Sequence, residues 1–538
     1  MKKKFLSMIT AIVMLISLLP QGILTVSAAI TATQPTGGDG TANNPYKIGT
    51  AAELYWFAAQ VNGGTTDINA VLTENIVVNT GVLKSDGTLA DDTSGFTSWT
   101  PIGNSSNQYI GTFDGQGHTV SGLYFNNTNA YNVGLFGYVS SNETNKGSVS
   151  NVGVVDSYFN GYVRVGGVCG YNSGTITNCY STAAVIGANQ VGGVCGENYG
   201  VITDCYNIGT VSSLENAGGV CGMNSGTIAN SYNIGIVSGT SNVGGVCGST
   251  GGGTIENCYS TAAVIGANQV GGVCGENHGT IAFCYNTGTV SGTKYVGGVC
   301  GFNSVNTPIA NCYFDSEKYS GNAVAQNGSY TVTNVEGKTT DKFASGEVAY
   351  LLQSGQKADE NGNIPEVWGQ NIGTDNSPVL TSDIAKKVLR VEFKTLSADG
   401  EYTLYAEKYG NYDEALSDFP EEITGTIWVD GVNQFAASSR VTEDKTVYPV
   451  GYSVKYNDDG KVVISAPKPG NYKIIIASYS GESLLKVQSA GITLESWVDL
   501  YEITDLNGFD TTGADKVKVF FWDTEMRPQC DAAVKTLS

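Results

Sequence analysis

The sequence is poor in charged residues and in histidine. Only 14% of its 538 residues are charged, against about 25% in a typical protein, and its two histidines, His118 and His278, lie in different parts of the chain. Zinc sites need three or four ligands clustered in space, so we interpret both histidines as turn or surface residues. No Cys-x-x-Cys pair occurs, so a zinc ribbon or a thioredoxin-like redox site has no support. We expect no metal ion and no cofactor.

Long apolar runs are also scarce. After residue 29 no stretch is apolar enough to span a bilayer, and before it Pro20 interrupts the apolar run short of the ~20 residues that a spanning helix needs. Three lysines at positions 2–4, an apolar stretch over 5–19 and Val26-Ser27-Ala28 form the pattern of a secretory signal peptide. We therefore expect export, cleavage of residues 1–29, and a secreted or cell-surface protein without membrane insertion.

Basic residues are outnumbered by acidic ones. The chain has 28 Lys and Arg against 49 Asp and Glu, which gives a formal net charge of −21. A protein this acidic lacks the positive surface that nucleic acid or anionic lipid requires. We expect neither as a partner.

One short phrase recurs through the middle of the chain. VGGVCG begins at residues 165, 191, 243, 270 and 296, and AGGVCG at 217, so the spacing is 26 or 27 residues. A period in this range indicates stacked repeats. The 21 residues of 178–198 recur identically at 257–277, an offset of 79 that equals three repeats and indicates a copied block of three.

Each repeat contains three short runs typical of strands. In the first repeat these are GGVC at 166–169, TITNCY at 175–180 and AAVIG at 183–187, separated by turn-forming residues. Three strands in ~26 residues fit one coil of a parallel β-solenoid, whereas a propeller blade needs four strands in about 40 residues. We predict an all-β fold whose six strongest coils, at ~4.8 Å each, form a rod roughly 30 Å long.

Equivalent positions of successive coils should stack in ladders. One ladder is Val168, Val194, Val220, Val246, Val273 and Val299, a second is Ile176, Ile202, Ile228, Ile255, Ile281 and Ile309, and a third is Tyr180, Tyr206, Tyr232, Tyr259, Tyr285 and Tyr313. Asparagine recurs after the first strand as Asn172, Asn198, Asn224, Asn277 and Asn303, with Thr250 in the fourth unit. Stacked asparagines at a turn can pass amide hydrogen bonds from coil to coil.

The cysteines follow the same period. The first series is Cys169, Cys195, Cys221, Cys247, Cys274 and Cys300, and the second is Cys179, Cys205, Cys258, Cys284 and Cys312, with Ser231 in place of one member. Side chains stacked at ~4.8 Å suit disulfide geometry poorly, because the Cβ atoms must come within about 4.5 Å. We predict two ladders of buried, mostly reduced thiols.

The phrase GGVCGxNxGTIxNCYxxGxV, preceded by VGLFGYV at 133–139, resembles the GLUG-motif repeat of bacterial surface and secreted proteins. The resemblance is close over 133–313 and looser from 111–123 to 367–380. In that family the motif occurs in adhesins and in large exported proteases that cleave immunoglobulin A. Those proteases carry a separate zinc-peptidase domain with an HExxH motif, which is absent here. Cysteine at the fourth position of GGVCG departs from the commoner GGLVG.

The segments outside the repeats are expected to close the rod and to extend it. Residues 50–62 predict a helix that packs over the first coils, with Thr50 and Glu53 at capping-box spacing, and residues 343–355 predict a second helix. The last part of the chain, with GNYKIIIASY and ADKVKVFFWD, resembles β-sandwich modules of clostridial-type secreted proteins, which usually serve attachment or spacing. The predicted parts are a signal peptide (1–29), an N-terminal cap with irregular coils (30–132), repeats (133–313), a closing segment (314–385), a small β module (386–450) and a C-terminal β module (451–538).

Paired carboxylates, which polysaccharide-cleaving enzymes need, are not evident. Glu197 and Glu276 lie three repeats apart, ~14 Å at one strand spacing per coil, beyond the roughly 5 to 9.5 Å that such mechanisms use. Asp114 and Asp156 precede the main repeats and have no evident partner. No residue is therefore nominated as catalytic.

Aromatic residues offer a better candidate for function. Tyr171, Tyr199 and Phe302 are placed in turns after the first strand, where they could dock sugars or a protein, or be ordinary surface aromatics. We predict a non-enzymatic extracellular β-solenoid for surface adhesion, or for binding host or environmental glycan or protein polymers. A polysaccharide lyase or glycoside hydrolase and a passive surface stalk are the alternatives.

Overall fold

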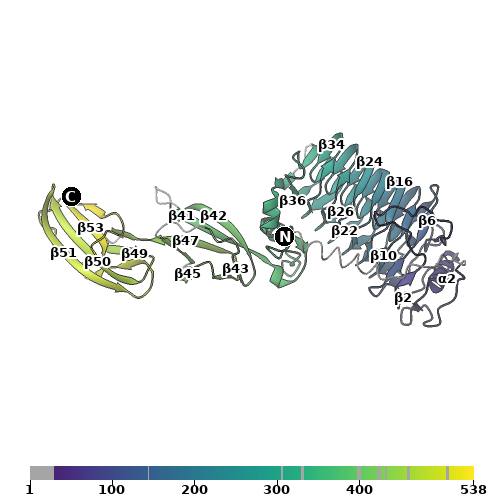
Figure 1. The fold of residues 1–538 in the computed structure, drawn as a ribbon, viewed down its shortest axis with the longest axis horizontal. Coiled ribbons are helices and arrows are strands. Elements are labelled where there is room, and N and C mark those ends of the chain that lie inside the picture. Colours follow the sequence, from purple (N-terminus) through teal and green to yellow (C-terminus); the bar gives the residue numbers. More distant parts are fainter. Residues whose placement is uncertain are drawn as a thin grey trace. The chain divides into compact units, whose positions relative to one another are not determined.

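The chain divides into two compact units (Figure 1). The first unit comprises the chain up to Ala310 together with the segment Lys318–Val335. The second comprises the segment Asn311–Glu317 together with the chain from Glu336 onward. The predicted signal peptide lies outside the described residues. The computed structural model describes residues 30–142, 144–304, 307–328, 332–396, 402–420, 426–430, 433–456, 461–504 and 508–537.

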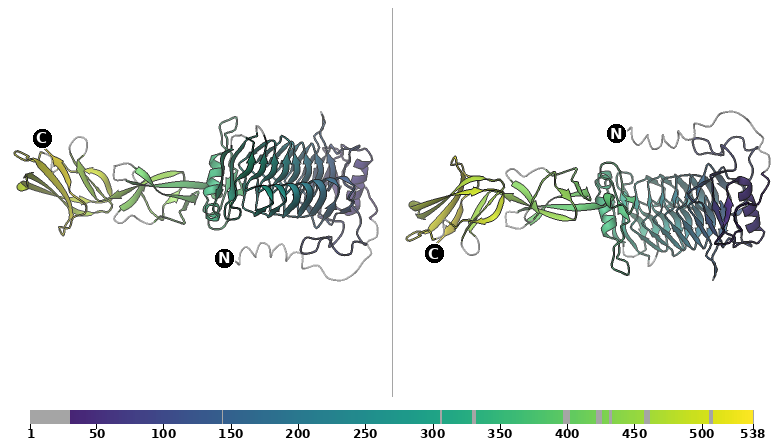
Figure 2. Two further views of the ribbon diagram at one scale, coloured as in Figure 1. Left: turned by 90° about the horizontal axis from the view of Figure 1, so that it is seen from above. Right: turned by 90° about the horizontal axis from the view of Figure 1, so that it is seen from below.

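The first unit is a parallel β-solenoid with a period of about 26 residues, as predicted (Figure 2). Three parallel sheets run along it. The eight-stranded sheet comprises β8 (Phe136–Val139), β13 (Cys169–Asn172), β17 (Cys195–Asn198), β21 (Cys221–Asn224), β25 (Cys247–Thr250), β30 (Cys274–Asn277), β35 (Cys300–Asn303) and β37 (Val324–Asn327). The eleven-stranded sheet comprises β6 (Tyr124–Asn126), β7 (Tyr131–Val133), β11 (Tyr158–Asn160), β12 (Val163–Gly166), β16 (Ala184–Gly192), β20 (Val211–Gly218), β24 (Val237–Gly244), β28 (Val264–Ile265), β29 (Asn268–Gly271), β33 (Val290–Ser291) and β34 (Lys294–Gly297).

The third sheet has nineteen strands and supplies the remaining side of each coil. It comprises β1 (Tyr46–Ile48), β2 (Ala70–Leu72), β3 (Ile76–Val77), β4 (Thr112–Asp114), β5 (Thr119–Ser121), β9 (Ser148–Ser150), β10 (Gly153–Val155), β14 (Thr175–Thr177), β15 (Tyr180–Ser181), β18 (Val201–Thr203), β19 (Tyr206–Asn207), β22 (Thr227–Ala229), β23 (Tyr232–Asn233), β26 (Thr254–Glu256), β27 (Tyr259–Ser260), β31 (Thr280–Ala282), β32 (Tyr285–Asn286), β36 (Ile309–Asp315) and β38 (Val332–Lys338).

The strand boundaries within a coil differ from the prediction. GGVC is not a strand, because Gly167 and Val168 form the corner between β12 and β13. A Cβ on Gly167 would lie 2.2 Å from the Ser181 Oγ, so only glycine fits this corner. TITNCY is interrupted at Asn178, whose φ of 51° is left-handed, a conformation that asparagine tolerates better than most residues.

The ladders form the core of the solenoid. Ile176 pairs with Ile202, and the register continues in the same column to Ile309. The Val168 N–H donates to the Val194 carbonyl at 3.0 Å, and both side chains are fully buried. On the outer side of the nineteen-stranded sheet, the rings from Tyr180 to Tyr285 stack with centroids 4.7 to 4.9 Å apart. Identical residues in register thus bury a continuous apolar interior.

Helix α2 (Ala51–Asn62) covers the first coils, as predicted. Thr50 and Glu53 form a capping box, and the helix ends at Gly63. Its apolar face is buried, and the Phe57 ring lies 5.9 Å from the Phe113 ring of β4. The helix therefore closes an end that would otherwise expose apolar side chains to water.

The predicted helix at 343–355 is two helices in the structure. Helix α3 (Thr340–Ala344) and helix α4 (Glu347–Ser354) are separated at Gly346, whose φ of 92° is incompatible with a continuing α-helix. Val348, Ala349 and Leu352 of α4 are buried. The apolar pattern was interpreted correctly, but the break at glycine was missed.

The rest of the second unit consists of small sheets around two hydrophobic cores. Val391, Phe393 and Trp428 lie in one core, and Ile464, Ile474 and Phe521 in the other. None of the described helices is both long and apolar enough to cross a membrane. The elements are β39 (Trp368–Gly369), β40 (Val379–Leu380), a 3-10 helix (Ile384–Lys386), β41 (Val388–Leu396), β42 (Tyr402–Asn411), β43 (Glu414–Ala415), β44 (Thr426–Asp430), β45 (Asn433–Phe435), β46 (Arg440–Val441), β47 (Lys445–Gly451), β48 (Ser453–Tyr456), β49 (Val462–Ala466), β50 (Gly470–Ser480), β51 (Ser483–Leu494), β52 (Val498–Glu502), β53 (Lys516–Asp523) and β54 (Ala533–Thr536).

Candidate binding face along the eight-stranded sheet

The eight-stranded sheet presents a line of outward side chains along the solenoid. In the five strands with the sequence CGxN (β13, β17, β21, β30 and β35) the cysteine and the asparagine are buried, while the residue before the asparagine alternates to the outer side. A second line of residues, each with a left-handed backbone conformation (positive φ), runs beside the first. We define the face by both lines: Tyr171, Glu197, Met223, Ser249, Glu276 and Phe302, and beside them Arg164, Gln190, Asn216, Asn242, Gln269 and Tyr295.

Tyrosines gather at the end of the face nearer the N-terminal coils. The Tyr171 ring lies 4.3 Å from the Tyr138 ring and 5.5 Å from the Tyr199 ring. Tyr199 is 50% exposed, because it follows β17 in a turn. The guanidinium of Arg164 lies 5.0 Å from the Tyr171 ring centroid, within cation–π range. This tyrosine end combines exposed ring surface with a fixed charge.

A buried carboxylate, that of Glu197, lies next to Tyr171 on the neighbouring strand. Glu197 is only 3% exposed, and its Oε2 lies 2.5 Å from the Arg164 Nε. A buried carboxylate needs such a partner, because an isolated charge away from water is very costly. Burial, with the neighbouring Tyr138 and Glu197, raises the pKa of Tyr171. The Tyr171 hydroxyl therefore remains protonated at neutral pH.

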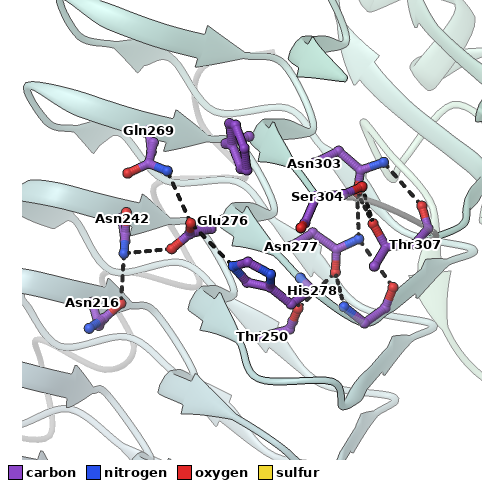
Figure 3. Close-up of polar contacts among 12 residues, drawn as sticks. Asn216, Asn242, Thr250, Gln269, Glu276, Asn277, His278, Asn303, Ser304 and Thr307 are labelled. Carbon is purple, nitrogen blue, oxygen red and sulfur yellow. Dashed lines mark hydrogen bonds and ion pairs between the residues drawn. The ribbon is translucent and has the colours of Figure 1, made fainter. Parts of the chain in front are cut away.

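Amide side chains surround the second carboxylate of the face (Figure 3). Asn242 Nδ2 donates to Glu276 Oε2 at 3.0 Å, and Gln269 Nε2 donates to Oε1 at 3.2 Å. His278 Nε2 lies 3.2 Å from the same Oε1, and Asn242 also donates to Asn216 Oδ1 at 3.0 Å. Side chains from three successive coils are joined in this network, so it holds the outer surface of the face in a fixed arrangement.

Behind the face lies the predicted asparagine ladder. Asn172, Asn198 and Asn224 are fully buried, and the amides of Asn172 and Asn198 each donate to the next Oδ1 at 2.8 Å. The Asn224 amide donates instead to the carbonyls of Gly226 and Thr254. Thr250 takes the place of asparagine by donating to Asn277 Oδ1 at 2.8 Å, and Asn277 in turn donates to Asn303 (Figure 3). These hydrogen bonds satisfy polar groups at a buried turn.

Sequence reasoning missed a second buried ladder. Asn207 donates to Asn233 Oδ1 at 2.9 Å, at the corner that follows the tyrosine ladder. The equivalent positions hold Ser181, Ser260 and Asn286, all buried. The signal was present, because asparagine or serine recurs two positions after Cys179, Cys205, Ser231, Cys258 and Cys284.

The cysteines of both ladders are buried thiols in the structure. In the first ladder each Sγ donates to the carbonyl two residues ahead, as from Cys195 to Glu197 at 3.2 Å. In the second ladder it donates to the carbonyl two residues before, as from Cys205 to Thr203 at 3.1 Å, and Ser231 makes the same bond to Ala229 at 2.7 Å. Burial raises the pKa of Cys195, Cys205, Cys247 and Cys274 well above that of a free thiol. Remaining thiols of the first ladder, Cys169, Cys221 and Cys300, are likewise fully buried.

Two of the three predicted binding aromatics are brought together. Tyr171 and Tyr199 stack, whereas Phe302 lies five strand steps away, ~24 Å, beside Tyr295 at 6.2 Å. The placement of Tyr171 and Phe302 in turns was wrong. Both lie within strands, β13 and β35, because each of these strands begins at the cysteine and not before it.

The other residues singled out in the sequence have structural surroundings. Asp114 accepts from the Gln116 N–H, which fixes a local turn, and from the Asn151 amide. Asp156 accepts from the backbone N–H groups of residues 81 and 83, so it anchors a segment that lies far from it in the sequence. Burial raises the pKa of Asp156. The His118 N–H closes a turn with the Gly115 carbonyl. In the described part of the chain, no three His, Cys, Asp or Glu residues are grouped to hold a metal ion.

Comparison with known proteins identifies GLUG motifs in the coils that carry this face. The family model for the GLUG motif matches residues 161–186, 187–212 and 239–265. Halomucin of Haloquadratum walsbyi is 33% identical over 157 residues, 28% of this chain and 2% of that protein. A protein of Evansella cellulosilytica described as a Gly-rich membrane protein is 31% identical over 145 residues, 26% of this chain and 15% of its own length. The chain thus spans a small part of these relatives, and no solved structure matches it.

Proposed function

We propose that this GLUG-repeat β-solenoid is a non-enzymatic extracellular adhesion protein that binds glycan through the tyrosine end of its face. The observation that carries the proposal is the stack of Tyr138, Tyr171 and Tyr199 beside the Arg164–Glu197 pair. Exposed rings pack against the C–H faces of sugars, while nearby fixed polar groups orient the hydroxyls.

A glycan is favoured over a protein polymer by the chemistry around the rings. Protein interfaces center on an apolar core depleted of charge, but here the rings surround an ion pair and border amides. Tyr171 and Tyr138 also present hydroxyls, which suit a hydroxyl-rich ligand. If the protein binds a matrix protein and no glycan, the ligand of this face is a protein and the glycan proposal is wrong.

The surroundings of the carboxylates support binding without cleavage. Glu197 is held by Arg164, and Glu276 accepts from Asn242 and Gln269. Register places these two carboxylates three strand steps apart, ~14 Å, beyond the separation of retaining or inverting glycosidases. An extracellular location rests on the signal-peptide pattern of residues 1–29.

The test is a glycan array and a polysaccharide pull-down with the mature protein and two variants. Tyr199→Ala removes the exposed ring and should weaken glycan binding about threefold to tenfold. Tyr501→Ala, which removes a tyrosine of similar exposure in the second unit, is the matched control and should bind normally.

A reducing-sugar assay on the same polysaccharides completes the test. We expect no sugar release by the wild-type protein. Release that is absent from heat-inactivated samples would overturn the non-enzymatic proposal, and failure to bind any glycan or matrix protein would favour a passive stalk.

A further inference from the structure

We infer that the whole face is one binding track for a linear, uncharged polysaccharide that lies along the solenoid axis. The track runs from Tyr171 and Tyr199 at one end to Phe302 and Tyr295 at the other. This inference rests on the proposed function and adds to it the class of glycan, its direction and its minimum length.

The register of the sheet aligns the two aromatic ends. Tyr171 pairs with Glu197, and the same column continues through Met223, Ser249 and Glu276 to Phe302. Five parallel strand steps separate the ends, a distance of ~24 Å. A ligand that contacts both ends must therefore be extended and must run across the strands.

The residues between the ends suit a chain of hydroxyl groups. Gln190, Asn216, Asn242 and Gln269 follow one another in successive coils, each half-buried and each with an amide that both donates and accepts. Such side chains match the chemistry of sugar hydroxyls, which likewise donate and accept hydrogen bonds.

The charges of the track disfavour an anionic polymer. Arg164, the only cation among the twelve residues that define the face, is paired with Glu197, and Lys294 lies beside the far end, with its Nζ 4.5 Å from the Tyr295 ring centroid. Met223 and Ser249 separate this pair from Glu276, so the middle of the track offers no positive charge. With a net charge of −21 on the chain, an anionic polysaccharide would be repelled.

Two aromatic ends joined by one polymer act as a bivalent site. A short oligosaccharide reaches one end only, whereas a chain that spans ~24 Å engages the second end at high effective concentration. The physical signature is an affinity that rises sharply at one oligosaccharide length instead of gradually.

The experiment is calorimetric titration with oligomers of β-1,4-linked glucose and of N-acetylglucosamine, from dimer to octamer, and with hyaluronan oligomers as the anionic series. For an uncharged series we expect weak binding of short oligomers and at least tenfold tighter binding once the oligomer spans both ends. Phe302→Gln should abolish this rise and leave the binding of short oligomers at the tyrosine end unchanged. Gln326 occupies the next position of the column, so glutamine is compatible with the register.

Phe302→Tyr, which keeps an aromatic ring, is the control and should retain the rise, and melting curves of all variants verify folding. Binding that depends on Tyr199 but is independent of oligomer length and of Phe302 would overturn the track while leaving the proposed function intact. Tighter binding of hyaluronan than of the uncharged oligomers would also overturn it. Binding of branched glycans on the array without binding of any linear oligomer would do the same, and no glycan binding at all would contradict both proposals.

Discussion

At several positions of this solenoid, different residue types make the same hydrogen bond, so the bond determines which side chains fit. Cys205 and Ser231 occupy equivalent positions, and each donates to the carbonyl two residues before it. Thr250 similarly replaces an asparagine because its hydroxyl still reaches Asn277. The cysteines therefore serve as small side chains with a weak donor, and their reactivity is suppressed by burial.

Replacing Cys205 by serine should be tolerated, whereas valine should not. Serine preserves the donor, as Ser231 does, so we expect a loss below about 1 kcal/mol in the free energy of unfolding. Valine removes the thiol donor to the Thr203 carbonyl, which still accepts from the Asn178 N–H, and leaves the buried Cys179 N–H without its acceptor, at about 1 to 3 kcal/mol. Urea unfolding monitored by circular dichroism measures the unfolding free energy of both variants. Equal losses in the serine and valine variants would contradict the hydrogen-bonding role of Cys205.

Stability should fall at alkaline pH because of these thiols. Burial raises the pKa of Cys195, Cys247 and Cys274 above the value of about 8.5 for an unfolded thiol. At these thiols the unfolded chain loses protons first, so their contribution to stability is complete below about pH 8.5 and declines as the pH rises beyond it. Unfolding free energies measured between pH 7 and 10 check this. Cys195→Ser should make the decline shallower, and stability that increases over this range would contradict it.

At the scale of single elements, corners and caps determine where each strand or helix ends. β14 ends where Asn178 becomes left-handed, and α3 and α4 are separated by the left-handed Gly346. Helix α2 begins at the Thr50–Glu53 capping box and places Phe57 against the first coils. The helix is short, so its cap contributes a large share of its local stability.

Thr50→Ala should loosen helix α2 without unfolding the solenoid. The Thr50 Oγ1 accepts from the Glu53 N–H at 3.2 Å, and loss of such a cap costs about 1 kcal/mol. Hydrogen exchange of the backbone amides of 53–56 should become about fivefold faster, while that of the coil strands stays the same. Thr50→Ser keeps the cap and should resemble the wild type; equal acceleration in both variants would argue against capping.

The whole first unit is a one-dimensional stack in which each coil contacts its neighbours. The sequences of 178–198 and 257–277 are identical, so both segments offer the same side chains to the coils beside them, although β16 of the first is divided into β28 and β29 in the second. Stability of such a stack is approximately a sum over coils and the interfaces between them. Whole coils should therefore be removable if the period is respected.

Excision of residues 179–257, which joins Asn178 to Cys258, should give a folded solenoid shorter by three strand spacings, ~14 Å. Every ladder remains in register, so we expect an unchanged far-ultraviolet dichroism per residue and a single cooperative transition. Small-angle scattering measures the shorter rod. Excision of 183–257 shifts the register by four residues and is the control, expected to aggregate or unfold; equal folding of both would contradict in-register stacking.

The sequence by itself determined the parallel β-solenoid, because a 26-residue period with short strand runs leaves few other folds. It also located the Val168, Ile176 and Asn172 ladders, since equivalent positions must coincide in a stack. The cap helix at 51–62 followed from local rules, the capping box and the apolar spacing. Each of these features depends on nearby residues or on exact repetition.

Only the tertiary structure decided which residues of one line of the face contact residues of the other line. Arg164 reaches Glu197 and Gln269 reaches Glu276, and both Arg164 and Gln269 have a left-handed backbone within a strand, β12 or β29. The 26-residue period does not specify where a strand begins, so Tyr171 and Phe302 were assigned to turns when they lie in strands. Where a coil bends depends on close approaches such as that of Gly167 to Ser181, which join residues on different sides of the coil.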